Sequence, residues 1–483
     1  MKKIILSVAV ILFCLTAIFV YLGKTAIESK TGKSFAEKIA SKIPGHQKEF
    51  IKKIFFKNEI LKLEIKNRDK LIKELQNIEK IKNDIIIEKY NKIYFEKPRE
   101  LLTDIEEYSI FLYQTKFLTN GKNDFAIASG YIDIFDEHLI VVTGDGLLFK
   151  IEINKIINKK DDFFAKQINT NFRKLINLPE FFKKSYFGIK DVLIMNNKIF
   201  LSFSNEVSDD CFNTGILKGD LDMDYIEFEK ISLSEKDCVK KDKMDNALQG
   251  GRLVKYSDNE IFFTHGDWFN DNKAQDKQSI FGKVIKLNVE SNKFEIVSYG
   301  HRNPQGLVYI KEANLIFETE HGPIGGDEIN VINLNNLEID KNYGWPIASY
   351  GKGEQRSAKS FISTNKKYKS HKGFIEPIKY YVPSIGISEI VKVSSGFFSE
   401  NRDNFDFFVS SLGTKVSEGD LSLHHLEIDQ NSFEILNENI IPIQERIRDV
   451  IYHKKSENLI LFIESDRMYK GGPSIGVFKY NKK

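Results

Sequence analysis

The chain has 483 residues and a formal net charge of +3. A charge this small, with no basic run interleaved with aromatic residues, argues against a nucleic-acid-binding protein. The length exceeds that of one ordinary domain, although a β-propeller can use this many residues in one closed unit. We therefore expect one large domain with an extension.

The N-terminal residues 4–22 form an uncharged apolar stretch behind Lys2 and Lys3. In an α-helix, with a rise of ~1.5 Å per residue, the stretch spans roughly 28 Å, close to the thickness of a bilayer core. It is long for a signal peptide, and no small-x-small cleavage site follows it. We predict a transmembrane signal-anchor over residues 1–23, with a cleaved signal peptide as the alternative.

Residues 24–100 form a basic segment that contains 20 Lys/Arg and 12 Asp/Glu. Between residues 50 and 87 it has no proline or glycine, and its apolar residues recur at helical spacing. This pattern predicts a mainly helical stem that ends near Pro98. A short coiled coil and a stalk packed on the rest of the chain are the alternatives.

Residues 101–483 contain a repeat in which a short apolar run, a polar turn and a second alternating run recur. Six units start about 60 residues apart, with one wider gap after the fourth: Tyr131, Asp191, Arg252, Gly306, Glu389 and Asp449. β-Branched and aromatic residues between Asn, Asp and Gly turns are typical of strands. The repeat predicts an all-β, six-bladed β-propeller with an insertion in the fourth blade.

Cys211 and Cys238 are the two cysteines outside the predicted anchor, and both fall within one repeat unit. A disulfide in an exported protein would account for them. Two cysteines buried separately as small apolar residues would account for them nearly as well. Their spacing fits no metal-thiolate site.

Three motifs in a fixed order are the most specific feature of the chain. They are GHRNPQG at 300–306, EHGPIGGDEIN at 320–330 and NYGWP at 342–346. In this order they resemble the quinoprotein glucose/sorbosone dehydrogenase family, propellers that hold pyrroloquinoline quinone (PQQ) on a calcium ion and oxidise aldose sugars. The resemblance implies PQQ and calcium as cofactors, and an aldose or related alcohol as the substrate.

PQQ carries carboxylates and a reactive quinone, so its site needs fixed cations. The resemblance implies that Arg302 and Asn303 hydrogen-bond the cofactor and that Arg446 and Arg448 bind its carboxylates. Two arginines at i and i+2 on a strand point to the same face, although alone they would indicate a solvated strand face. Lys415 lies near the position of the family's cofactor lysine, in a shifted register, and a solvated loop lysine is the alternative.

Calcium prefers oxygen ligands, including the backbone carbonyls that a Gly-Pro turn presents. The resemblance implies that the carbonyls of Gly322 and Pro323 hold the catalytic calcium. We expect His321, beside them, to be a hydrogen-bonded surface residue. A neighbouring structural calcium is implied at Asp327, Glu328 and Tyr343.

The catalytic base of the family is missing from its expected position. The resembling enzymes use a histidine before a small-Gly-Arg turn, and here Leu248 occupies that position. Leucine cannot accept a proton. Asp267, which matches the carboxylate that orients the histidine, is present, and His265 is a tentative substitute for the base. A packed core histidine is the alternative for His265.

These residues and the resemblance lead to one expected function. We expect a single-pass inner-membrane protein with its propeller in the periplasm, passing electrons from an aldose or related alcohol to a respiratory electron acceptor. The charges that flank residues 4–22 nearly balance, so this location rests on the resemblance. The alternatives are a non-catalytic propeller that binds a carbohydrate or a protein partner, and an enzyme with a relocated base.

Overall fold

The computed structural model describes residues 92–480, apart from 102–107, 116–128, 177–187, 209–210, 232, 235, 241–247, 352–366, 369, 395–403, 414–415 and 465–472. All of them belong to one compact unit, residues 85–483. Within this described part, no helix is both long enough and apolar enough to cross a membrane. The predicted anchor over residues 1–23, most of the predicted stem and Lys415 lie outside the described residues.

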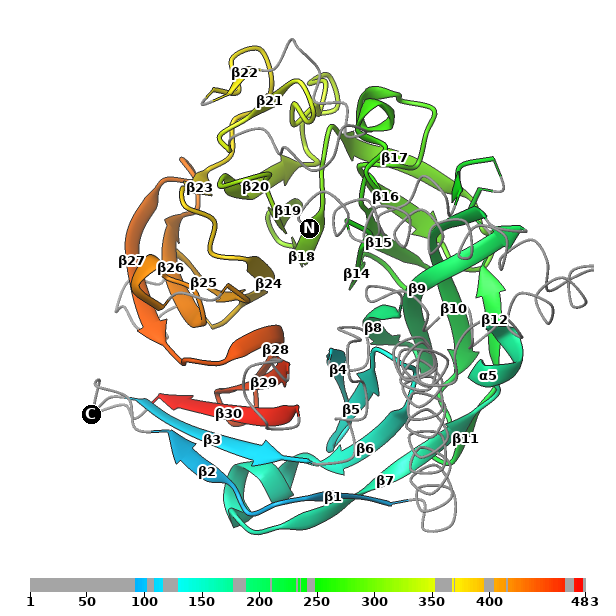
Figure 1. Cartoon of the computed structure of the whole chain (residues 1–483), viewed down its shortest axis with the longest axis vertical. Coiled ribbons are helices and arrows are strands. Elements are labelled where there is room, and N and C mark those ends of the chain that lie inside the picture. Colours follow the sequence, from blue (N-terminus) through cyan, green and yellow to red (C-terminus); the bar gives the residue numbers. More distant parts are fainter. Residues whose placement is uncertain are drawn as a thin grey trace, which may run out of the picture. The chain divides into compact units, whose positions relative to one another are not determined.

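Six antiparallel sheets surround a central axis as the blades of a propeller (Figure 1). The innermost strand of each sheet contains the start of a predicted repeat unit. These strands are β4 (Gly130–Phe135), β8 (Ile189–Met195), β14 (Gly250–Lys255), β18 (Pro304–Ile310), β24 (Ile387–Lys392) and β28 (Arg446–His453). The predicted six-bladed propeller is confirmed.

The other strands follow outward in each blade. Blade 1 adds β5 (His138–Thr143), β6 (Leu148–Glu152), β7 (Phe163–Thr170), β1 (Lys92–Phe95) and β11 (Tyr225–Ile226); blade 2 adds β9 (Lys198–Ser208), β10 (Cys211–Asp220), β12 (Phe228–Ile231) and β13 (Val239–Lys240). Blade 3 adds β15 (Glu260–His265), β16 (Lys283–Asn288) and β17 (Phe294–Tyr299); blade 4 adds β19 (Leu315–Glu320), β20 (Asp327–Asn333) and β23 (Lys379–Tyr381). Blade 5 adds β25 (Asn404–Ser411), β26 (Ser422–Asp429) and β27 (Ile435–Pro442); blade 6 adds β29 (Asn458–Glu464), β30 (Ser474–Tyr480), β3 (Tyr108–Gln114) and β2 (Arg99–Leu101).

The insertion predicted in the fourth blade lies between β20 and β23, and it contains the small parallel pair β21 (Ala348–Ser349) and β22 (Lys367–Tyr368). Helical segments among the described residues are short. They are Lys155–Lys159, α5 (Phe172–Leu175), Asp271–Gln275 and Val416–Glu418.

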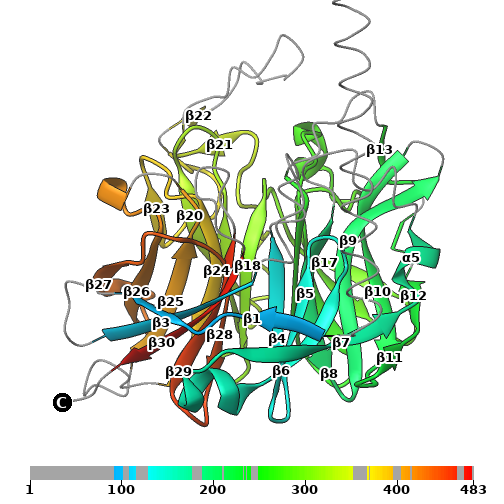
Figure 2. The same cartoon turned by 60° about the horizontal axis from the view of Figure 1, so that its bottom comes forward.

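The ring closes with strands from both ends of the chain. In blade 6, β3 pairs with β30, so a strand that precedes Tyr131 completes the last repeat. Blade 1 likewise receives β1 on the outside of β7, which Figure 2 shows from the side. β1 lies inside residues 24–100, where the sequence indicated a helical stem, and β2 begins there, so the propeller begins before residue 101. Pairing both ends in one sheet covers an edge that would otherwise be open.

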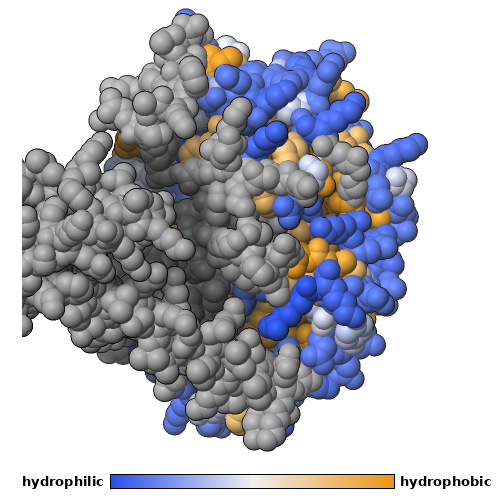
Figure 3. Space-filling model, turned by 45° about the vertical axis from the view of Figure 1, so that its right-hand side comes forward, coloured by the Kyte–Doolittle hydropathy of each residue, from blue (hydrophilic) through white to orange (hydrophobic). Residues whose placement is uncertain are grey.

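Strands in the blades are apolar on both faces because each blade packs between two others. Phe407 and Phe408 are neighbours on β25, a strand in which all residues are buried, and they point to opposite faces. Phe407 packs in a cluster with Phe317 of blade 4, whereas Phe408 packs in a cluster with Leu461 of blade 6. On the outside, hydrophilic residues cover much of the described surface, with smaller hydrophobic patches between them (Figure 3).

A buried ionic cluster, here called the hub, lies where the innermost strands meet. Nη1 of Arg252 is 2.8 Å from carboxylate oxygens of both Glu389 and Asp449, and 3.1 Å from Asp191. The guanidinium also lies 5.0 Å from the ring centroid of Tyr131. These five residues are the first or near-first residues of repeat units in five different blades. Arg252 therefore connects five of the six blades at the centre of the ring.

Candidate functional site

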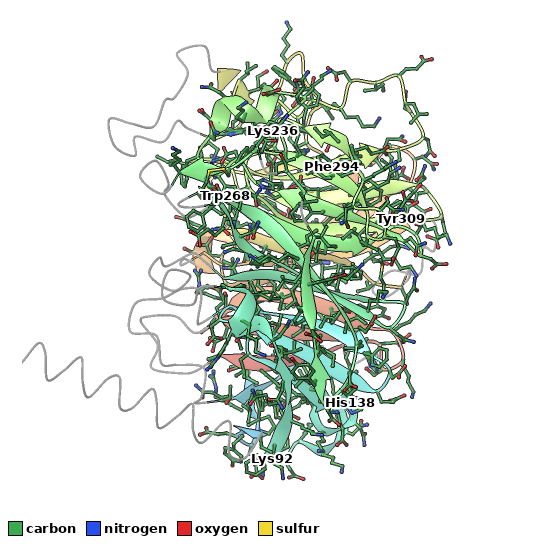
Figure 4. The ribbon with its side chains drawn as sticks, turned by 90° about the vertical axis from the view of Figure 1, so that its right-hand side faces the viewer. Lys92, His138, Lys236, Trp268, Phe294 and Tyr309 are labelled. Carbon is green, nitrogen blue, oxygen red and sulfur yellow. A yellow bond between two sulfur atoms is a disulfide. The ribbon has the colours of Figure 1, made fainter. Side chains whose placement is uncertain are left out.

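The motif residues gather at one face of the propeller. β14 and β15 pair at Gly250 and His265, and β18 and β19 pair at Pro304 and Glu320, so the segments next to these strand ends share a face. Figure 4 shows Trp268 toward this face and Tyr309, at the other end of β18, toward the opposite face. The loops after these strand ends carry the predicted site residues.

Arg446 and Arg448 share one buried carboxylate. Nε and Nη2 of Arg446 each donate to Oε2 of Glu464 at 3.2 Å, and Nε of Arg448 donates to Oε1 at 2.5 Å. Burial opposes ionisation of Glu464, but Arg448 and Arg446 outweigh it and lower the pKa of this carboxyl group. The predicted shared face of the two arginines is confirmed. Because two guanidinium groups share one carboxylate, this pair keeps a net positive charge.

Arg302 contacts the predicted calcium turn directly. Its Nη1 donates to the carbonyl oxygens of His321 at 3.0 Å and Gly322 at 2.6 Å, and its guanidinium lies 5.4 Å from the ring centroid of Trp345. Its backbone N–H donates to Oε2 of Glu320 at 2.7 Å. The side chain is therefore held between the turn and an aromatic ring.

His321, whose carbonyl oxygen accepts a hydrogen bond from Arg302, has a neutral imidazole. Burial lowers the pKa of its imidazole to about 4, Asp327 opposes the shift, and Arg302, Arg448 and Arg446 reinforce it. The side chain is 23% exposed, and its assignment as a hydrogen-bonded surface histidine stays a prediction. Because the imidazole is neutral at pH 7, it adds no positive charge to the pocket. Arg448 of blade 6 contacts blade 4 through its hydrogen bond to Gln305.

Asn303 and Gln305 connect the arginines from different blades. Nη1 of Arg448 donates to Oε1 of Gln305 at 3.2 Å, and Nε2 of Gln305 donates to Oδ1 of Asn303 at 3.1 Å. The same Asn303 oxygen accepts the backbone N–H of Gly250 at 3.2 Å. The predicted cofactor residues thus form one hydrogen-bonded group. Sequence reasoning missed Glu464, which stands in none of the three motifs, and gave no role to Gln305, which stands inside the first of them.

The Gly322 turn is fixed by backbone packing. A Cβ atom on Gly322 would lie 2.1 Å from the Gly326 carbonyl oxygen, so no other residue fits without displacing the turn. Oδ1 of Asp327 accepts the Gly322 N–H at 3.1 Å, and Oδ2 accepts the Ile387 N–H at 3.0 Å. Asp327 therefore supports the turn that presents the Gly322 and Pro323 carbonyls.

The side chains of Glu328 and Tyr343 contact residues outside the Gly322 turn. Glu328 follows Asp327 on β20, so its side chain projects from the opposite face, where it lies 2.9 Å from Nε2 of His371. Burial raises the pKa of Glu328 to about 7. The hydroxyl group of Tyr343 donates to the Val331 carbonyl at 2.6 Å. Assignment of these residues to a second calcium stays a prediction.

Leu248 lies next to the segment that carries Asp267, and its assignment to the base position stays a prediction. Its carbonyl oxygen accepts the backbone N–H of Trp268 at 3.1 Å, and its φ of 59° lies in the left-handed region. Asp267 accepts the Trp345 indole N–H at 2.6 Å and the Phe269 N–H at 2.9 Å. Burial raises the pKa of Asp267 to about 7, while Arg302 opposes that shift.

His265 is fully buried within blade 3. Its Nε2 accepts the backbone N–H of Thr214 at 3.2 Å, and burial lowers the pKa of the imidazole to about 3. Because both ring nitrogens of His265 are engaged in these buried contacts, neither is available to accept a proton from a ligand in the pocket. The geometry favours a packed core histidine over a substitute base.

The residues present fit a polyanionic ligand. The positive charge left on the Arg446 and Arg448 pair, together with Arg302, matches the carboxylates of PQQ. The Gly322 carbonyl already accepts a hydrogen bond from Arg302, and a carbonyl oxygen has a second lone pair for a metal ion. A calcium ion so close to a guanidinium group is favourable only when an anionic ligand binds beside both.

Comparisons with known proteins agree with the motifs. The family model described as "Glucose / Sorbosone dehydrogenase" matches residues 158–469. The chain is 28% identical to the aldose sugar dehydrogenase YliI of Escherichia coli over 259 residues, which cover 50% of this chain and 66% of that protein. It is 34% identical to quinoprotein glucose dehydrogenase B of Acinetobacter calcoaceticus over 133 residues, covering 21% and 27% of the two chains.

The sequence matches cover only part of the length of the curated relatives. An uncharacterized protein of Synechocystis is 31% identical over 226 residues, 42% of this chain and 50% of that one, so the chain spans half to about two thirds of the first curated relatives. Among solved structures, the soluble aldose sugar dehydrogenase of Escherichia coli in its apo form aligns with a TM-score of 0.55 and 21% identity, covering 73% of this chain and 95% of that chain. This likeness supports the fold, and the family match covers well over half of the sequence. The chain belongs to the glucose/sorbosone dehydrogenase family.

Proposed function

We propose that this protein is a PQQ- and calcium-dependent oxidoreductase that oxidises an aldose or a related alcohol. One observation carries the proposal: Arg448 of blade 6 is hydrogen-bonded through Gln305 to Asn303 of blade 4, next to Arg302, whose guanidinium donates to the Gly322 carbonyl. Several fixed guanidinium groups next to backbone carbonyls suit an anionic, metal-bound cofactor. Family membership supports the same assignment.

In this proposal each residue has a binding or positioning role. Arg446 and Arg448 bind cofactor carboxylates, and Glu464 holds both arginines in place. Arg302 and Asn303 orient the quinone, while the carbonyls of Gly322 and Pro323 ligate calcium. When bound, PQQ supplies the acceptor for the two electrons that leave the substrate.

Removal of the substrate proton is the step that we expect to be slow. The side chain of Leu248 cannot accept a proton, and general-base assistance typically contributes about 10²–10⁴-fold. Asp267 lies next to Leu248, and its raised pKa leaves it partly protonated near neutral pH. We therefore expect cofactor binding with slow turnover of aldoses.

A non-catalytic propeller is the second candidate, and Leu248 is the observation that favours it. Loss of a base removes catalysis without removing the arginines or the Gly322 turn. Such a protein would use the pocket to bind a carbohydrate or a protein partner.

We also propose that the propeller lies in the periplasm, attached to the inner membrane by residues 1–23, and passes electrons to a respiratory acceptor. The disulfide between Cys211 and Cys238 supports an oxidising compartment. Protease treatment of spheroplasts tests the location. Digestion of the propeller supports it, and protection of a propeller that is protease-sensitive after lysis contradicts it.

Titration of the full chain in detergent with PQQ and calcium, followed by quinone absorption, tests cofactor binding. We expect saturable, calcium-dependent binding that Arg448→Met weakens strongly. Arg99→Met is the matched control, because Arg99 is 64% exposed and pairs with Glu445. Dye reduction with a panel of aldoses then measures turnover. Binding without turnover favours the non-catalytic propeller, and absence of binding by folded protein contradicts the cofactor assignment.

A further inference from the structure

Blade 4 contains a buried polar cluster apart from the arginine pocket. Glu318 and Glu320 lie two residues apart on β19, and Glu318 pairs with Asn330 of β20, so all three side chains project from one face of the sheet. His301, from the segment before β18, lies against them. The four residues are at most 3% exposed.

The same face of blade 4 also carries buried Glu328, which pairs with His371, and beyond these residues it is apolar. The paired residues Ile316 and Ile332 project from the same face, two residues further along their strands. They pack with Phe262 and Leu307 between blades 3 and 4. Ionised carboxylates are unfavourable in such a core unless a cation compensates them. Among the described residues, the imidazole of His301 lies against Glu318 and Glu320, and that of His371 pairs with Glu328. Two imidazoles do not balance three carboxylates.

The cluster also contains unpaired polar atoms. Nδ1 of His301, Oε1 of Glu318 and Oδ1 of Asn330 are buried and have no hydrogen-bond partner among the described residues. Buried polar atoms are nearly always paired, so three unpaired atoms in one cluster indicate a ligand. The Asn330 amide group donates to Oε2 of Glu318 at 3.1 Å and Oε1 of Glu320 at 3.2 Å, which holds the two carboxylates together.

We propose that His301, Glu318 and Glu320 bind a divalent transition-metal ion, Zn²⁺ or Mn²⁺. Their ligand atoms all lie within 4.8 Å of one another. Nδ1 of His301 is 3.8 Å from Oε2 of Glu318 and 3.5 Å from Oε1 of Glu320. These separations approach the ~3.4 Å expected between ligand atoms of a tetrahedral ion with bonds of ~2.1 Å. A dication would neutralise both carboxylates.

The ligand types favour a transition metal over calcium. Imidazole combined with carboxylates suits zinc or manganese, whereas calcium prefers oxygen ligands alone. Ser298 supports His301 from behind, with its hydroxyl oxygen 2.8 Å from Nε2. A proton on Nε2, donated to Ser298, leaves Nδ1 free to bind metal. Tyr343 stacks on the imidazole, with ring centroids 4.7 Å apart, and limits its rotation.

The site connects to the arginine pocket through Glu320, because its Oε2 accepts the Arg302 N–H. A bound ion would therefore fix the backbone that carries Arg302. The proposal does not depend on PQQ binding or turnover, and its test uses protein without PQQ.

The test measures retained metal. Full-length protein in detergent is stripped with chelator, incubated separately with Zn²⁺, Mn²⁺ or Ca²⁺, desalted and analysed by mass spectrometry for metal content. We expect about one equivalent of zinc or manganese per chain, and a rise in melting temperature on adding that ion. Retention of calcium alone, or of no ion, overturns the proposal.

Glu318→Gln and Asp406→Asn are the paired variants. Glu318→Gln removes a ligand and one buried charge, so it should lose the retained ion and its thermal response while melting no lower than the stripped wild type. Asp406→Asn changes a buried carboxylate that pairs with His425 at 2.9 Å in blade 5, and should retain the ion. Equal retention by wild type and Glu318→Gln contradicts the site.

Discussion

The guanidinium group of Arg252 lies 2.8 Å from a carboxylate oxygen of Asp449, and these two residues come from blades 3 and 6, which face each other across the axis. The same guanidinium donates through Nη2 to the carbonyl oxygen of Arg448 at 2.9 Å. The hub therefore fixes the strand that carries one of the pocket arginines. Stability of the ring and geometry of the pocket depend on the same buried cation.

Arg252→Met should destabilise the propeller by about 3–5 kcal/mol, because it leaves three buried carboxylates without their cation. Urea denaturation followed by fluorescence measures the change. Lys198→Met is the control: it removes a partner of Asp220, whose side chain is 88% exposed, and should change stability little. Equal stability of Arg252→Met and wild type would show that the hub carboxylates are already neutral.

The hub should also make stability depend on pH. Burial raises the pKa of Asp191 to about 7 and that of Glu389 to about 8, above their usual values, so folding takes up protons. Their contribution to stability is therefore present at acidic pH and is lost as pH rises through the range from about 4 to 8. Asp191→Asn mimics the protonated group, so the stability of wild type relative to this variant should fall from pH 5 to pH 8. Denaturation series across this range measure the slope, and a parallel pair of curves contradicts the assignment.

Leu248→His should raise aldose turnover by up to about 10²–10⁴-fold if PQQ binds, since it restores a general base beside Asp267. Histidine tolerates left-handed backbone better than most residues, so the φ of 59° at this position should not prevent folding. Leu421→His is the matched control, because Leu421 has a φ of 53° in blade 5. Dye reduction with holo protein compares the variants. Unchanged rates in Leu248→His with bound PQQ would mean that proton transfer is not the missing step.

The predicted alternatives for the cysteines are resolved in favour of a disulfide. Cys211, at the start of β10, is bonded to Cys238, at 27 residues' separation, next to β13. Replacing both by serine should lower the free energy of unfolding by about 2–4 kcal/mol. Thermal melts with and without reductant measure the effect. Reductant should lower the melting temperature of the wild type and not that of the double variant.

The repeat in the sequence predicted the blades because each innermost strand is an apolar run after a polar turn, as at Asp191 and Asp449. The motifs predicted the pocket because Arg302 and Gly322 lie in segments where few residue types fit. Glu464 lay beyond prediction, since it ends an ordinary apolar strand and acts only through its pairing with Arg446. β1 and β3 could not be predicted from the sequence either, because each is a single short strand whose pairing partner is distant in the sequence. Their role arises from pairing with strands far along the chain.

The pairing of β3 with β30 has a consequence for biosynthesis. The strand Tyr108–Gln114 is translated well before Ser474–Tyr480, so its partner is absent while most of the chain is made. The growing polypeptide can assemble five blades one after another, but the circle stays open until residues 474–480 have left the ribosome. A nonsense codon before residue 474 would therefore remove β30 and leave β3 without its partner.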